Sequence, residues 1–157
     1  MVSAMAGALK YFIERLEIDT SDLEWDFDTR FEIQKRVKLL QLEPAISRFI
    51  NYDFGMYVRG PYSRFLAEDY YNLSSVIPVA TKLSARSENY LRMVSRLPTS
   101  DLELLSSIAQ VMSFSRNAPD ESIVGKVKDL KPKFELSQIR ASLGKFREFQ
   151  RRFDLTT

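Results

Sequence analysis

The sequence predicts a mainly α protein, a single-domain helical bundle of about six or seven helices. Five glycines and six prolines among 157 residues are few, whereas β-rich folds need many turn residues. Apolar residues recur at helical spacing along most of the chain, and residues 52–59 instead alternate with a period of two. That stretch predicts one short extended segment or small β element. No repeat, low-complexity tract or linker divides the chain, so one domain is expected over residues 1–157.

The first expected helix covers about residues 3–17, where Leu9, Phe12 and Ile13 lie on one apolar stripe. An acidic connection follows, and residues 14–28 hold seven acidic residues against one arginine, a net charge of −6. Its alternating carboxylates resemble a calcium-binding loop only superficially, because the central glycine and the closing glutamate are missing. A solvated acidic loop that contains the only tryptophan, Trp25, is the better interpretation.

The second expected helix begins at Asp28 or Thr29, and either side chain can cap it. Its inner stripe is apolar and its remaining faces are basic, with Ile33, Val37 and Leu40 inside and Arg30, Lys35, Arg36 and Lys38 outside. Pro44 should interrupt this helix. A short helical turn over residues 45–50 then leads to the extended segment.

The alternation between Tyr52 and Arg59 indicates a β-strand. Its partner stays open: it pairs with another short segment, for which residues 25–27 are one candidate, or it is extended without a ladder. Gly60-Pro61 ends the extended segment, because the residue before a proline avoids the helical region. Ser63 then caps a helix whose inner side is expected to carry Phe65, Leu66, Tyr70 and Leu73.

Four further helices are expected in the second half of the chain. The first of them stops at Pro98. Ser100–Glu103 has capping-box spacing and opens the next helix, residues 101–114. That helix is apolar around nearly its whole circumference, so it is the expected centre of the core. Pro119 begins the following helix, and Ser137 can cap the last one.

The composition argues against catalysis. The chain has no cysteine and no histidine, which removes thiolate chemistry, the commonest general base and the commonest transition-metal ligand. No glycine-rich phosphate loop or nucleophile motif is present. Neighbouring carboxylates such as Glu68 and Asp69 point about 100° apart on a helix, so they do not converge on one ion. We expect a non-enzyme without a cofactor or metal, with a metal-dependent hydrolase as a minor alternative.

The sequence also predicts where the protein resides. No stretch approaches the roughly 18 apolar residues of a membrane span, and the start of the chain lacks the basic residue that precedes a signal peptide core. We therefore expect a cytoplasmic protein without membrane contact.

Aromatic residues gather between Tyr52 and Tyr71. Phe54, Phe65 and Tyr70 are assigned to the core, where extended segment and helix meet. The exposure of Tyr57, Tyr62 and Tyr71 stays open, because Arg59 and Arg64 lie close by in the sequence and aromatic and arginine side chains dominate protein-binding hot spots.

Two roles are therefore assigned around the turn. In the structural interpretation, the turn is built by Gly60, Pro61 and Ser63, and Tyr62 fills the core beneath it. In the functional interpretation, a protein partner is bound by Tyr57, Arg59, Tyr62 and Arg64.

The C-terminal part of the chain is basic. Residues 122–153 hold nine lysines and arginines against three acidic residues, a net charge of +6. One interpretation is a nucleic-acid-binding regulator whose last helices contact phosphates through Arg140, Arg147 and Arg151. The other is a solvated helix face, or a surface that meets an acidic protein.

Three segments resemble prokaryotic protein families. Tyr57-x-x-Gly60-Pro61-Tyr62-Ser63-x-x-Leu66 is similar to a motif of the YwgA-like uncharacterised proteins, and the related Panacea (SocA-like) antitoxin domain carries a similar Gly-Pro turn before a helix. Upstream, Arg30-Phe31-x-x-Gln34-Lys35 resembles the helix that precedes this motif in both groups. Downstream, Val127-Lys128-x-Leu130-Lys131-Pro132-Lys133-Phe134 is similar to a late segment of YwgA-like proteins.

The resemblance implies a mostly helical domain without known catalytic residues. For the Panacea relatives, the implied role is neutralisation of a toxin by direct protein contact. We therefore expect a non-catalytic protein-interaction module, antitoxin-like or regulatory, whose partner is a protein.

Overall fold

The computed structural model describes residues 2–155 and confirms the mainly α prediction. Within these residues the chain forms seven α-helices, two short 3-10 helices and one two-stranded antiparallel sheet. The elements in chain order are α1 (Ala6–Arg15), α2 (Phe27–Leu40), η1 (Ile46–Arg48), β1 (Gly55–Tyr57), β2 (Gly60–Tyr62), α3 (Arg64–Tyr70), η2 (Leu73–Ser75), α4 (Ala85–Arg96), α5 (Thr99–Ser113), α6 (Asp120–Leu130) and α7 (Leu136–Phe153). None of the described helices is long and apolar enough to cross a membrane.

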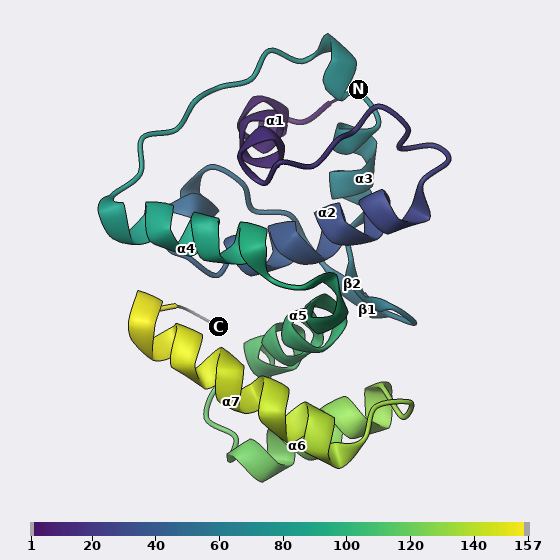
Figure 1. The fold of residues 1–157 in the computed structure, drawn as a ribbon, viewed down its shortest axis with the longest axis vertical. Helices are drawn as coiled ribbons and strands as arrows, with labels where there is room; N and C mark the ends of the chain where they lie inside the picture. Colours follow the sequence, from purple (N-terminus) through teal and green to yellow (C-terminus); the bar gives the residue numbers. More distant parts are fainter. Residues whose placement is uncertain (1, 156–157) are drawn as a thin grey trace.

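Helix α5 lies in the middle of the molecule, as its sequence predicts. It packs against α2, α6, α7 and both strands, with α2 and α4 on one side and α6 and α7 on the other (Figure 1). Leu102, Leu105 and Ile108 are fully buried. Because apolar residues cover nearly its whole circumference, α5 serves as the core element around which the other helices pack.

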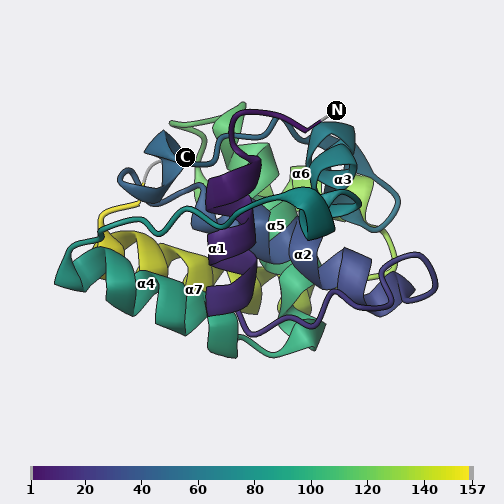
Figure 2. The ribbon, with the colours of Figure 1, turned by 90° about the horizontal axis from the view of Figure 1, so that it is seen from above.

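The N-terminal helix α1 packs on α3 at the end of the molecule away from α6 and α7 (Figure 1). The long connection between η2 and α4 crosses α1 (Figure 2), and the Val79 amide donates to the Gly7 carbonyl at 2.9 Å. A Cβ atom at Gly7 would lie 2.7 Å from the side chain of Val79. Glycine therefore permits this close approach of the connection to the helix.

The predicted ends of several helices are wrong, because capping depends on side chains that periodicity does not reveal. Helix α1 covers Ala6–Arg15 rather than residues 3–17. The backbone amide of Ser3 instead donates to the carboxylate of Asp69 in α3 at 2.8 Å. Helix α2 is capped by Asp26, whose carboxylate accepts from the Thr29 amide at 3.1 Å, rather than by Asp28 or Thr29.

Two later helix starts also differ from the prediction. Helix α5 begins at Thr99 directly after Pro98, so the predicted box at Ser100–Glu103 lies within the first turn. Helix α7 is capped by Glu135, and the Glu135 amide donates to the Gln138 side chain at 2.9 Å. This reciprocal capping box takes the place that the sequence assigned to Ser137.

The extended segment forms half of a β-hairpin. Strand β1 pairs with the immediately following β2, with Gly55 opposite Tyr62 and Tyr57 opposite Gly60. The extended segment therefore pairs with another short segment, so the alternative without a ladder is wrong, and the partner is β2 rather than residues 25–27. Gly60-Pro61 belongs to the second strand rather than ending the structure. A sheet of two strands has only edge strands, which tolerate a proline.

The basic residues of α2 are not all solvated, contrary to the prediction. Lys35 and Arg36 are buried. The Arg36 guanidinium donates to the carbonyl oxygens of Val94 and Leu97 at 2.6 and 3.0 Å, where α4 ends. Helix ends present unpaired carbonyl groups that attract cations, so tertiary packing gives these charges partners within the core. The assignment of Phe65 to the core is also wrong, because its side chain is exposed.

Candidate functional site: the hairpin and the pocket beside it

The hairpin turns at Val58 and Arg59, and Gly60 makes the turn possible. Gly60 has φ of 103°, a conformation that glycine adopts without steric cost and that follows the turn in many hairpins. A Cβ atom at this position would lie 3.3 Å from both the Lys35 Cε and the Ser107 Oγ. Backbone conformation and crowding therefore both require glycine at this position.

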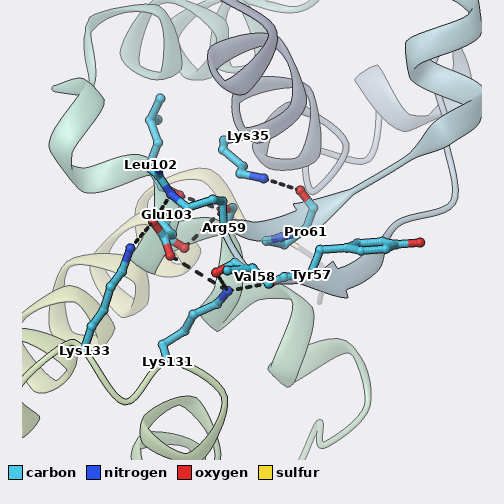
Figure 3. A network of polar contacts seen from close by, with 10 residues as sticks. Lys35, Tyr57, Val58, Arg59, Pro61, Leu102, Glu103, Lys131 and Lys133 are labelled. Carbon is cyan, nitrogen blue, oxygen red and sulfur yellow. Dashed lines mark hydrogen bonds and ion pairs between the residues drawn. The ribbon is translucent and has the colours of Figure 1, made fainter. Parts of the chain in front are cut away.

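Helix α2 holds the second strand through two adjacent polar side chains. The side-chain amide of Gln34 donates from Nε2 to the Ser63 carbonyl at 2.9 Å and accepts at Oε1 from the Ser63 backbone amide at 2.8 Å. This pair of hydrogen bonds resembles the one that a neighbouring β-strand would make. The Lys35 ammonium donates to the Pro61 carbonyl at 2.6 Å (Figure 3). The Ser63 hydroxyl in turn accepts from the Leu66 amide and caps α3.

The other strand is held from the far end of the chain. The Lys131 ammonium, just after α6, donates to the carbonyl oxygens of Tyr57 and Val58 at 2.5 and 2.6 Å (Figure 3). The Gln110 side chain donates to the Phe54 carbonyl at 2.9 Å. The three segments that carry the family resemblance thus meet at this hairpin, although they lie far apart in the sequence.

A single carboxylate lies among the cations that surround the hairpin. Glu103 of α5 is 5% exposed, and its oxygens lie 3.0 Å from Lys133, 3.2 Å from Arg59 and 3.8 Å from Lys131 (Figure 3). Burial lowers the pKa of Lys35 to about 8, against the opposing attraction of Glu103. The cluster therefore carries a net positive charge at neutral pH.

An open pocket of about 380 Å³ lies between the hairpin, the start of α2 and the end of α3. It is lined by Phe27, Arg30, Phe31, Gln34, Lys35, Tyr57, Val58, Arg59, Gly60, Tyr62, Tyr70 and Tyr71. The walls are aromatic and include three cationic side chains, and no acidic residue of the described chain lines them. The pocket therefore suits a group that combines an apolar body with negative charge.

Three of the four predicted partner-binding residues line this pocket. Tyr57 and Tyr62 meet edge to face with their ring centres 5.5 Å apart, and Arg59 lies 5.0 Å from the ring centre of Phe31. Tyr62 is 37% exposed, so it forms part of the pocket wall instead of filling the core beneath the turn. Arg64 lies outside the pocket lining and covers the ring of its neighbour Phe65 at 5.1 Å.

The sequence provided no signal for the other half of the site. Phe27 lies in the acidic connection, Phe31 and Gln34 appear only in the upstream resemblance, and Glu103 appears only in the predicted capping box. The helix pattern places Lys35 on a basic outer face, so none of these signals indicates a binding site. The role of Lys35 depends on a hairpin carbonyl 26 residues away, and such a contact leaves no local pattern.

The predicted nucleic-acid contacts on α7 are largely engaged with acidic residues. Arg140 pairs with Glu121 at 3.1 Å and Arg147 pairs with Asp120 at 2.7 Å, whereas Arg151 is exposed. A different basic groove, about 550 Å³, lies between α4 and α7. Its cationic lining residues are Arg92, Arg96, Lys145 and Arg152.

Comparison with protein-family models, curated proteins and solved structures finds no match for this chain. Within residues 2–155, no group of three or more acidic residues is arranged to hold a metal ion.

Proposed function

We propose that this protein is a non-catalytic interaction module, antitoxin-like or regulatory, that binds a protein partner beside the hairpin. The surface involved, called the hairpin face below, consists of the pocket-lining residues Phe27, Arg30, Tyr57, Val58, Arg59, Tyr62 and Tyr71. The observation that carries the proposal is the exposure of five large apolar side chains around one pocket.

Two physical properties of the hairpin face support this role. Large apolar side chains that gather on a soluble surface mark interaction sites, and tyrosine and arginine are the residues most often found as binding hot spots. The face is also held firmly, since Gln34, Lys35 and Lys131 all donate to hairpin carbonyl groups. A rigid surface loses little conformational entropy when a partner binds.

Affinity capture from the source cells tests this proposal. The bait is the tagged chain, compared with a Tyr57→Ala/Tyr62→Ala variant and with Phe114→Ala, a control at an 81% exposed residue outside the pocket lining. We expect a specific protein to be recovered with the wild type and the control and to be lost with the double variant. Equal recovery by all three folded proteins would rule out the hairpin face as the binding surface.

A second candidate function is nucleic-acid binding, and the groove between α4 and α7 is the observation that favours it. Four cations line this groove, and one of them, Lys145, pairs with Asp101 at 2.8 Å. Phosphate binding by such a groove releases counterions, so affinity falls as salt concentration rises.

Fluorescence anisotropy with a labelled strand of about 20 nucleotides tests the second candidate. Replacing Arg92 and Arg152 by alanine should weaken binding. It should also reduce the slope of the logarithm of the binding constant against the logarithm of salt concentration by about 2. Replacing the paired Arg140 and Arg147 serves as the control and should change affinity less. Binding that is absent, or insensitive to the groove variant, would exclude this function.

A further inference from the structure

Trp25 is an apolar side chain that the folded chain leaves uncovered. It is the only tryptophan in the sequence, and its exposed fraction is 87%. Tryptophan carries a large apolar surface and is enriched in binding hot spots. A free monomer would leave most of this surface in water.

The loop that carries Trp25 is held in a defined conformation. The backbone amides of Trp25 and Asp26 both donate to the Asp22 carbonyl at 3.0 Å. The Arg30 guanidinium donates to the carbonyl oxygens of Leu23 and Glu24 at 2.6 and 3.1 Å. The indole is therefore presented on an ordered turn, which lowers the entropic cost of inserting it into a partner.

The surroundings of Trp25 and the hairpin pocket are complementary in charge. Four exposed carboxylates accompany the indole, from Asp22, Glu24, Asp26 and Asp28. The pocket has aromatic walls, cations from Arg30, Lys35 and Arg59, and no acidic lining residue in the described chain. Its volume of about 380 Å³ lies in the range of sites that hold drug-sized groups, which are larger than an indole.

Trp25 does not occupy this pocket in its own chain. It lines a neighbouring cavity that shares Tyr70 and Tyr71 with the hairpin pocket. An acidic loop and a basic pocket thus lie side by side on one face. A two-fold rotation places each loop opposite the pocket of another copy, so the face is complementary to itself.

The charge next to the pocket favours a second copy over an unrelated acidic protein. Residues 14–28 carry a net charge of −6, so a partner that brought only negative charge would complement the pocket but not the loop beside it. In a two-fold pair, the acidic loop of each copy instead lies over the basic pocket of the other. Both loops then meet opposite charge.

We propose that the hairpin face binds a second copy of this chain, with Trp25 of each copy inserted into the hairpin pocket of the other. This inference rests on the proposed function, because it names the partner of the same face. The dimer is stabilised by indole burial and by charge attraction, so added salt weakens it.

Sedimentation velocity and tryptophan fluorescence on the full chain test the inference. As the concentration rises, the sedimentation coefficient should increase and the Trp25 emission should shift to shorter wavelength over the same range. Trp25→Ala, and separately Val58→Asp at the pocket rim, should each raise the dimer dissociation constant at least about tenfold. Phe114→Ala, which removes a similarly exposed ring elsewhere, should leave it unchanged.

Mixing the two variants gives a stricter test. Trp25→Ala retains an intact pocket and Val58→Asp retains an intact tryptophan, so the mixed pair recovers one of its two contacts. We therefore expect mixed dimers to form at concentrations where each variant alone stays monomeric.

The outcomes separate this inference from the proposed function. A chain that stays monomeric at all concentrations, or a dimer that none of these variants weakens, overturns the inference. If the monomeric chain still captures another protein through Tyr57 and Tyr62, the proposed function stands with a different partner. If that capture also fails, both are wrong.

Discussion

Glu103→Gln is the substitution that most directly tests how the hairpin is held. The glutamine keeps the shape of the side chain but removes the one negative charge among the cations of the cluster. Lys131 is buried 3.8 Å from this carboxylate, and at an effective dielectric constant of about 20 two such charges attract by about 4 kcal/mol. Arg59 and Lys133 are half exposed, so solvent screening makes their contributions small.

The expected loss of unfolding free energy at pH 7 is about 3 kcal/mol, because removing one partner of a buried pair leaves an uncompensated charge. Urea unfolding followed by far-UV circular dichroism measures it. Tryptophan fluorescence is unsuitable, since Trp25 is already exposed in the folded monomer and its emission is the readout for association. The matched control is Glu121→Gln, which removes a solvent-exposed carboxylate paired with Arg140 and should cost less than about 0.5 kcal/mol.

The cost of Glu103→Gln should also shrink as the pH rises toward about 9. Burial lowers the pKa of Lys35 to about 8 and also lowers that of Lys131, so both lose their protons more readily in the folded state than in the unfolded chain. Once Lys35 is neutral, it no longer contributes an attraction to the Glu103 carboxylate, so removing that carboxylate costs less. The reasoning is refuted if Glu103→Gln costs no more than Glu121→Gln at pH 7.

Three further predictions concern stability and are checked by urea unfolding. Gly60→Ala should destabilise the protein by about 1–3 kcal/mol, because φ is positive at this position. The control Gly125→Ala, at an uncrowded position of α6, should stabilise it by up to about 1 kcal/mol. Equal changes in unfolding free energy for the two variants would contradict the strain expected at the turn. Ser63→Ala should cost about 1 kcal/mol through the lost α3 cap, and Ser137→Ala, at an unused cap position, should cost far less. Wild-type stability should rise between about pH 8 and pH 9.5, because the unfolded chain retains a proton on Lys35 that the folded chain loses. Burial lowers the pKa of Lys38 to about 8 as well, so Lys35→Met should reduce that rise without abolishing it, and an unchanged slope would show that Lys35 titrates normally.

Local patterns were sufficient for most of the helices. The apolar stripe of α2 and the largely apolar α5 are both predicted from spacing, because a helix forms its hydrogen bonds within a few residues. Ser63 was predicted as a cap for the same reason. Helix ends were less predictable, since Asp26 and Glu135 competed with equally plausible capping residues nearby.

The candidate site was predicted only in part. Tyr57, Arg59 and Tyr62 were recognised because aromatics and arginine adjoin an unusual turn, and they line the hairpin pocket. The strand partner was missed even though it begins three residues after β1 ends. A glycine followed by proline usually ends regular structure, and the buried surroundings that accommodate this pair come from α2 and α5.

Residue spacing alone predicts amphipathic helices around a largely apolar α5, with a break at the Gly-Pro turn. Which charges are buried depends on how the helices pack against the hairpin. Lys35 and Lys131 have the local pattern of solvated cations, but each donates to hairpin carbonyl groups and lies near Glu103. Helix periodicity depends on residues a few positions apart, whereas a buried lysine needs acceptors that folding brings from distant segments of the chain.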